Sequence, residues 1–67
     1  MKLLNIKRSD YWDCELNKAV TIYFSLTLSQ FEDIADDLRE LGYALVKCDA
    51  TVREFENSNH YVIVEME

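Results

Sequence analysis

The chain of 67 residues contains one glycine, Gly42, and no proline. Phosphate-cradling loops and the turn of dinucleotide-binding folds need several glycines, because the backbone there adopts positive φ or approaches the phosphate closely. Nucleotide-binding sites of these two kinds are therefore excluded. The lack of proline and the mixture of apolar and charged residues are typical of a globular domain and not of a disordered segment.

The sequence also has no run of 18 apolar residues, and residues 1–8 lack the apolar stretch of a signal peptide. We therefore expect a single domain, residues 1–67, in the cytoplasm. With only two cysteines, Cys14 and Cys48, we expect a reduced protein in that compartment. A bridge between these cysteines across neighbouring strands is the alternative.

Basic residues are scarce. Seven Lys and Arg stand against 13 Asp and Glu, which gives a formal charge of −6. A field of this sign repels nucleic acid, because phosphate binding depends on clustered Lys and Arg. We therefore expect neither nucleic acid nor a membrane as a direct partner, and instead a protein with a basic surface.

Residues suited to catalysis or metal binding are few. Cys14, Cys48 and His60 lack the close paired spacing of zinc ligands, and the aspartates of residues 33–37 fall on a predicted helix, which cannot wrap a calcium ion. Cys48 and His60 lie on adjacent strands of a predicted hairpin and are the least unfavourable nucleophile pair. Both alternate with apolar residues and fit the core or its margin better. We predict no cofactor, no metal and no enzymatic activity.

An alternating pattern over residues 20–27 predicts a strand with one buried face. Apolar Val20, Ile22, Phe24 and Leu26 alternate there with Thr21, Tyr23, Ser25 and Thr27. From residue 28 the apolar spacing changes to three and four, which predicts an amphipathic helix. Its stripe consists of Leu28, Phe31, Ile34, Ala35, Leu38 and Leu41.

Residues that can cap the helix are present at both of its ends. The available caps are Thr27 with Gln30, or Ser29 with Glu32. We favour Thr27, because the preceding leucine and Phe31 would then form a hydrophobic staple. Gly42 follows the last residue of the stripe and suits the left-handed conformation that ends a helix.

Strand patterns return over residues 43–52 and 60–66, and we expect them to form an antiparallel hairpin across the turn-forming segment 57–59. At the amino terminus, residues 3–6 predict a short edge strand. We expect residues 9–13 to form a turn, and residues 12–16 either form a separate strand or continue into the strand at Val20. The predicted fold class is α+β: a single, mostly antiparallel sheet of four or five strands, with one helix packed on one face.

The outer face of the predicted helix is acidic, and its five acids span less than half of the circumference. They are Glu32, Asp33, Asp36, Asp37 and Glu40. Like charges three and four residues apart destabilise a helix, and the lysines that usually accompany a solubilising face are absent. The face is either simply solvated or a surface that occupies a basic groove in place of nucleic-acid phosphates.

The predicted sheet has a second exposed surface. If the helix covers Val20, Ile22, Phe24, Val46, Val62 and Val64, the other face carries Tyr23, Tyr43, Leu45, Tyr61 and Ile63. Such an apolar face indicates a homodimer or a protein partner, unless a loop folds over it. Tyr11 and Trp12 are either aromatic anchors for a partner or, for Trp12, a residue that closes one end of the sheet.

Two functional hypotheses follow. The first is a small non-catalytic interaction protein that binds and inhibits a nucleic-acid-processing protein through its acidic helix. Inhibitor proteins from phages and plasmids that imitate DNA offer an analogy in size, charge and architecture only. The second is a homodimeric structural module that assembles through the aromatic sheet face.

Overall fold

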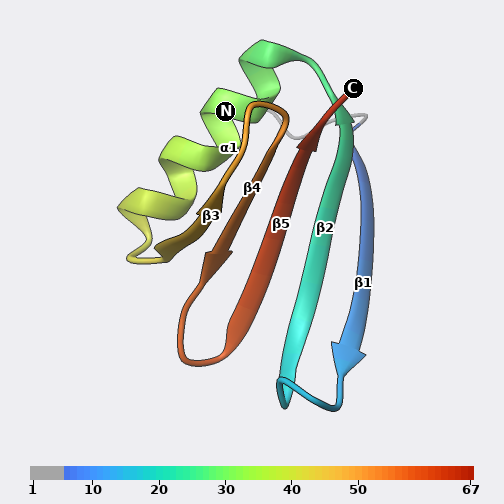
Figure 1. Cartoon of the computed structure of the whole chain (residues 1–67), viewed down its shortest axis with the longest axis vertical. Helices are drawn as coiled ribbons and strands as arrows, with labels where there is room; N and C mark the ends of the chain where they lie inside the picture. The colour runs from blue at the N-terminus through green and yellow to red at the C-terminus, as the bar shows by residue number, and fades with distance from the viewer. Residues whose placement is uncertain (1–5) are drawn as a thin grey trace.

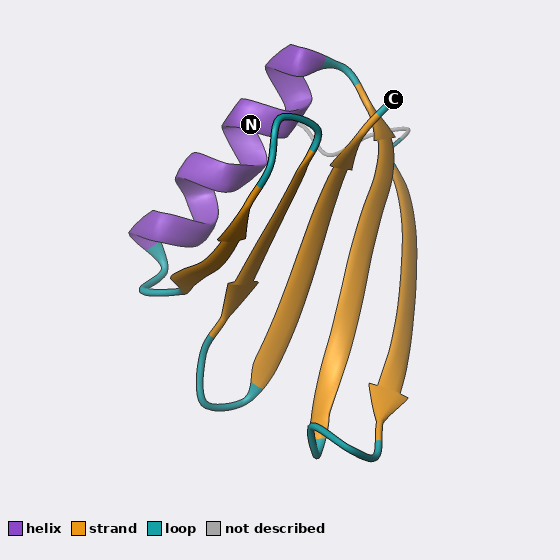
Figure 2. Ribbon diagram, in the orientation of Figure 1, coloured by secondary structure: helices purple, strands orange, loops and turns teal. Residues whose placement is uncertain are grey.

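The computed structural model describes residues 6–67, which form one sheet and one helix. The elements are β1 (Lys7–Asp13), β2 (Lys18–Leu26), α1 (Leu28–Glu40), β3 (Ala44–Cys48), β4 (Val52–Glu56) and β5 (His60–Met66). The strands follow the order β1-β2-β5-β4-β3, and α1 lies on one face of the sheet (Figures 1 and 2). Of the strand predicted at residues 3–6, residues 3–5 lie outside the described range, and Ile6 precedes β1.

The sheet is mixed. Three pairings between neighbouring strands are antiparallel, and the central pairing of β2 with β5 is parallel. This parallel pair arises because α1, β3 and β4 come between β2 and β5 in the chain. The predicted α+β class with one sheet and one helix is confirmed. α1 is neither long nor apolar enough to cross a membrane.

The strands after the helix differ from the prediction. The strand expected over residues 43–52 ends at Cys48, where the chain turns and the Asp49 N–H donates to the Val52 carbonyl at 2.7 Å. Residues 53–56, expected in a loop, instead belong to β4, which pairs with both β3 and β5. The predicted hairpin is wrong because the apolar alternation continues through a turn that contains no glycine or proline.

The amino-terminal half also differs. Residues 9–13, expected to be a turn, belong to β1. The turn lies at residues 14–17, where the Asp13 carboxylate accepts the N–H groups of the second and third residues after it, at 2.9 and 3.1 Å. Asn17 there takes a positive φ of 55°. Residues 12–16 therefore neither form a separate strand nor continue into β2.

The start of α1 is capped as predicted. The Thr27 hydroxyl accepts the Gln30 N–H at 3.2 Å, and the Gln30 side chain accepts the Thr27 N–H at 3.0 Å. This reciprocal pair satisfies two N–H groups at the helix start. The staple residues Leu26 and Phe31 are both buried in one core cluster.

The end of α1 forms the motif that the single glycine predicted. Gly42 has φ 91°, and its N–H donates to the Arg39 carbonyl at 3.0 Å. The N–H of Tyr43 donates to the Leu38 carbonyl at the same distance. These two bonds define a Schellman motif, which returns the chain toward the sheet as soon as the helix ends.

The core lies between α1 and the sheet. Its buried residues are Leu26, Phe31, Ile34, Ala35, Leu38, Phe55, Val62 and Val64. Full burial of a side chain of this kind contributes about 1.5–3 kcal/mol. The guanidinium of Arg53 lies over the ring of Phe31, 4.8 Å from its centroid, and covers one side of the core.

A bulge in β2 decides which side chains enter this core. The register places Tyr23 opposite Val64 and Leu26 opposite Met66, so β2 contains one extra residue. Ser25 within this segment has φ 56°. Because an extra residue reverses the side-chain alternation, Leu26 packs under α1 while the alternating residues before the bulge point away.

The face of the sheet away from α1, the open face, is therefore occupied differently from the prediction. Val20 and Ile22, expected beneath the helix, lie opposite Tyr61 and Ile63 on the open face. Phe24, which continues their alternation, belongs to the same face. Val46, also expected beneath the helix, is 49% exposed on β3.

The aromatic sheet face that the sequence predicted is divided between the two sides. Tyr23 and Tyr43 pack against the core beneath α1, and Leu45 is paired with a buried core residue of β4. Only Tyr61 and Ile63 remain on the open face. The predicted placement of the other three is wrong, because the β2 bulge and the β3–β4 turn exchange the faces.

Replacing Gly42 with alanine should destabilise the protein by about 1–2 kcal/mol, since an L-residue is strained at this positive φ. No atom within 4 Å of the added Cβ offers an alternative cause. Urea denaturation followed by circular dichroism measures the change. Ser25→Gly is the matched control: it should raise the free energy of unfolding or leave it unchanged, because it relieves the same strain. Equal losses in both variants would contradict this explanation.

Candidate interaction surfaces

The acidic face of α1 comprises Glu32, Asp33, Asp36, Asp37 and Glu40. Four of these side chains are exposed and Asp37 is half-buried. They point outward because the opposite side of α1 packs on the sheet through the buried residues Phe31, Ile34, Ala35 and Leu38, whereas the end residues of the predicted stripe, Leu28 and Leu41, are exposed. Within residues 6–67, no lysine or arginine forms an ion pair with any of them. The face therefore presents unpaired negative charge.

A hollow borders this face at the start of the helix. It has a volume of about 310 Å³ and is lined by Leu28, Ser29, Glu32 and Asp33. Leu28 is 60% exposed there. The acidic surface thus combines two carboxylates with one apolar side chain in a recess.

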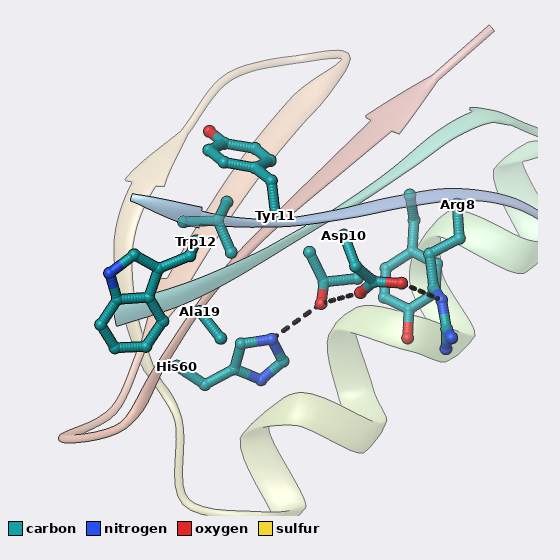
Figure 3. A pocket seen from close by; sticks show the side chains of 9 residues that line it. Arg8, Asp10, Tyr11, Trp12, Ala19 and His60 are labelled. Carbon is teal, nitrogen blue, oxygen red and sulfur yellow. Dashed lines mark hydrogen bonds and ion pairs between the residues drawn. The ribbon is translucent and has the colours of Figure 1, made fainter. Parts of the chain in front are cut away.

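A larger pocket lies on the same side of the sheet but beyond α1, over β1, β2 and the start of β5 (Figure 3). Its volume is about 510 Å³. The residues that line it are Arg8, Asp10, Tyr11, Trp12, Ala19, Val20, Thr21, Tyr23 and His60. In the close-up, Trp12 and His60 lie at one end and Arg8 lies at the other.

A chain of hydrogen bonds forms the floor of this pocket. Thr21 Oγ1 is 2.6 Å from Asp10 Oδ1 and 2.8 Å from His60 Nε2. The Tyr43 hydroxyl is 2.9 Å from His60 Nδ1, and Arg8 Nε is 3.0 Å from Asp10 Oδ2. The network therefore joins three strands of the sheet to the segment that follows α1.

The directions of these bonds follow from chemistry. An ionised carboxylate only accepts, so Thr21 must donate its hydroxyl hydrogen to Asp10. Thr21 Oγ1 then accepts from His60 Nε2, and in neutral His60 the other ring nitrogen accepts from Tyr43. In this arrangement His60 cannot receive the Thr21 proton, so the trio lacks the order of a nucleophile and its base.

The cysteine and histidine placements also differ from expectation. Cys48 lies on β3 and His60 on β5, and β4 separates the two strands. Their predicted position on adjacent strands is therefore wrong. Cys14 and Cys48 are free and exposed, and Cys48 does not belong to the core. Within residues 6–67, no group of three or more His, Cys, Asp and Glu side chains is placed to hold a metal ion.

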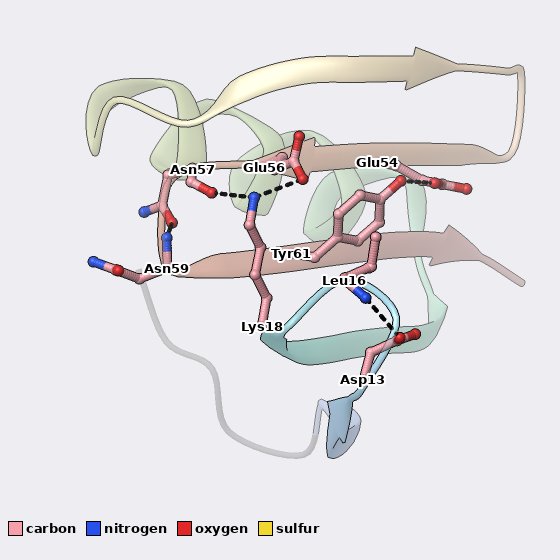
Figure 4. Close-up of polar contacts among 8 residues, drawn as sticks. All are labelled: Asp13, Leu16, Lys18, Glu54, Glu56, Asn57, Asn59 and Tyr61. Carbon is pink, nitrogen blue, oxygen red and sulfur yellow. Dashed lines mark hydrogen bonds and ion pairs between the residues drawn. The ribbon is translucent and has the colours of Figure 1, made fainter.

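The open face carries polar contacts between β2, β4 and β5 (Figure 4). Lys18 Nζ lies 2.7 Å from Glu56 Oε2 and 2.9 Å from the Asn57 carbonyl oxygen. The Tyr61 hydroxyl donates to Glu54. Burial, reinforced by this hydrogen bond and the nearby negative charge, raises the pKa of Tyr61 to about 12.

The lysines of the described residues lie away from the acidic face of α1. The three lysines of residues 6–67 are Lys7, Lys18 and Lys47. Lys7 shares the open face with Tyr11 by alternation along β1, Lys18 contacts Glu56 there, and Lys47 is paired with Glu54. Lysines thus lie on the open face, while unpaired acids lie on the helix.

The predicted aromatic anchors belong to β1, at the edge of the sheet, and not to a turn. Trp12 is 59% exposed and borders the pocket, so it does not close the sheet as a buried residue. Tyr11 is 46% exposed and points to the other side of β1 (Figure 3).

Sequence reasoning missed the network of Asp10, Thr21 and His60. The signal that was available is the alternation of Arg8, Asp10 and Trp12, which a strand places on one face. It was obscured because Ser9 and the two aspartates of β1 also favour turns.

Comparison with family models, with curated proteins and with solved structures finds no match to this chain. Any functional conclusion therefore rests on the acidic face of α1, the pocket and the open face.

Thr21→Val should lower the free energy of unfolding by about 1–3 kcal/mol, because Asp10 and His60 each lose a partner while the side-chain size is kept. Chemical denaturation measures this loss. Thr51→Val is the matched control, since Thr51 is exposed and forms no side-chain hydrogen bond within residues 6–67. A similar loss in both variants would show that the network contributes nothing.

Tyr61→Phe should change stability at high pH. Because the folded state raises the pKa of Tyr61 from 10 to about 12, its contribution is complete below pH 10 and is lost as the pH rises toward 12. The free energy of unfolding of the wild type should therefore fall more steeply over this range than that of Tyr61→Phe. Denaturation at several pH values tests the difference, with Tyr11→Phe as the control at an exposed tyrosine.

Proposed function

We propose that this chain is a non-catalytic protein-binding domain whose acidic helix face occupies the basic groove of a nucleic-acid-processing protein and inhibits it. The observation that carries this proposal is the set of five outward carboxylates with no ion-pair partner among residues 6–67. Among residues 6–67, Lys18 and Lys47 form ion pairs with other acids and with none on this face. The charge is therefore available to a second molecule.

The spacing of these charges supports imitation of a phosphate backbone. From Glu32 to Glu40 the helix advances about 12 Å, at 1.5 Å per residue. Five charges over this length lie about 3 Å apart along the axis, close to the ~3.4 Å rise per phosphate of one DNA strand. A groove that binds one nucleic-acid strand can thus meet charges at a similar density.

The lysines of the described residues do not neutralise this face. Lys7, Lys18 and Lys47 lie on the open face, away from the helix acids. The unpaired carboxylates of α1 attract a cationic surface during diffusion and accelerate association at low ionic strength. The hollow beside Leu28 adds an apolar contact that salt does not screen.

The competing hypothesis, assembly through the aromatic sheet face, loses support. Tyr23, Tyr43 and Leu45 lie on the helix side. Of the residues that replace them, Val20 is only 1% exposed, so the chain already covers it. Ile22, Phe24, Tyr61 and Ile63 are half-buried on this face, so none of them is a fully exposed anchor for a partner.

Reversing Asp33, Asp36 and Asp37 to lysine should abolish partner binding while the domain stays folded, since these side chains do not contribute to the core. A pull-down from a lysate of the source organism, at low and high salt, measures binding. The captured protein should itself bind DNA or RNA, and the wild-type chain should displace that nucleic acid. Binding should weaken as salt rises, because the contact is ionic.

The matched control is Glu15→Lys, Asp49→Lys and Glu67→Lys, which changes the net charge equally at exposed positions outside α1. It should retain most of the binding. If both triple variants lose binding equally, net charge and not the helix face is responsible. If the helix variant retains full affinity, the proposed function is wrong.

A further inference from the structure

Strand β1 leaves an unusual surface at the edge of the sheet. Both of its faces carry a large exposed aromatic, Trp12 toward the pocket and Tyr11 toward the open face. An outer strand also presents a row of backbone N–H and C=O groups to which another strand can add. Exposed Trp and Tyr side chains on such an edge are typical of contact residues in an interface.

The two edges of the sheet differ in regularity. β1 pairs with β2 over seven consecutive residues without a register shift. β3, at the other edge, has five residues and a register shift between Leu45 and Lys47. A bulge of this kind disrupts the ladder and hinders the addition of a strand. β1 is therefore the edge suited to pairing.

We propose that β1 binds β1 of a second copy of this chain, antiparallel about a two-fold axis at Asp10. The two sheets then become one continuous sheet, an isologous contact in which the same strand serves both partners. In this register the residues that face each other are Lys7 and Asp13, Arg8 and Trp12, Ser9 and Tyr11, and Asp10 and its own copy.

The sequence of β1 is complementary to itself in this register. Lys7 meets a carboxylate at each end of the pairing, and opposite charges across a strand pair attract. Arg8 lies across from the indole of Trp12, a favourable cation–π geometry. Every residue of the strand has a partner, and both exposed aromatics become covered.

The central pair of Asp10 carboxylates is the unfavourable element, because like charges directly opposite repel. Each carboxylate is already bound within its own chain, by Arg8 at 3.0 Å and by Thr21 at 2.6 Å. This offsets part of the repulsion. The hydrogen-bonded network beneath the pocket therefore prepares the edge for pairing.

β1 is better suited to self-association than the acidic surfaces of the chain because it has no net charge. A chain of charge −6 repels its own copy, but β1 carries two basic and two acidic residues and is neutral. α1 lies near the edge of the sheet opposite to β1 (Figure 1). Pairing through β1 thus keeps the two acidic helices at the far ends of the joint sheet.

Light scattering of the wild type over a concentration series tests the association. The mass should rise from monomer to dimer. The fluorescence of Trp12, the single tryptophan, should shift to shorter wavelength over the same range, since the indole becomes covered. A chain that remains monomeric up to about 1 mM, or a dimer that leaves Trp12 emission unchanged, overturns the proposal.

Lys7→Glu tests the edge, because it places like charges opposite each other at both ends of the pairing. The dimer dissociation constant should rise at least about tenfold, equivalent to about 1.4 kcal/mol. Lys47→Glu, the same charge change on β3, is the control and should leave the constant within about twofold. If both variants weaken the dimer equally, the contact does not involve β1.

Cysteine cross-linking tests the register in a chain that carries Cys14→Ser and Cys48→Ser. Asp10→Cys should form a disulfide between copies, because Cα atoms directly opposite lie about 4.5–5.5 Å apart. Ser9→Cys lies diagonally from its copy, about 8 Å away, beyond the reach of a disulfide. Equal cross-linking at both positions would contradict the axis at Asp10.

Discussion

The packing of the apolar stripe of α1 onto the sheet is the interaction on which the rest of this structure depends. Phe31 from the helix and Phe55 from β4 are essentially inaccessible to solvent. A domain of this size buries only about 60% of the surface that its unfolded chain exposes, so this single cluster supplies most of its apolar stabilisation. Because the stripe must face inward, the acids of α1 must face outward.

The helix covers only part of the sheet, and a different kind of interaction holds the remainder. Beyond α1, Asp10, Thr21 and His60 form a polar chain that ends on Tyr43, at the start of the segment after the helix. Partly buried networks of this kind are sensitive to the loss of any member, since the remaining groups are left without partners. The part of the sheet near β1 therefore depends on hydrogen bonds, and the part beneath α1 depends on apolar packing.

The helix could be predicted from the sequence, whereas the polar network near β1 could not. The cap at Thr27, the stripe and the closing Gly42 are local patterns, in which residues a few positions apart determine the conformation. The pocket unites residues of β1 and β2 with a residue of β5, which α1, β3 and β4 separate from them in the chain. Its composition depends on β1 being a strand, and the aspartates of β1 favour a turn when the chain is read alone.

The sequence by itself determined an α+β domain with one amphipathic helix, its two ends and its acidic outer surface, because helical periodicity is a local property. Only the tertiary structure decided the strand pairing and the faces of the sheet. One extra residue near Ser25 moves Leu26 under the helix and leaves Val20 on the other side. Side chains alternate with a period of two, so each bulge or unsignalled turn reverses every later position. The pairing that selects among these registers is made across the sheet, between residues that sequence spacing does not relate.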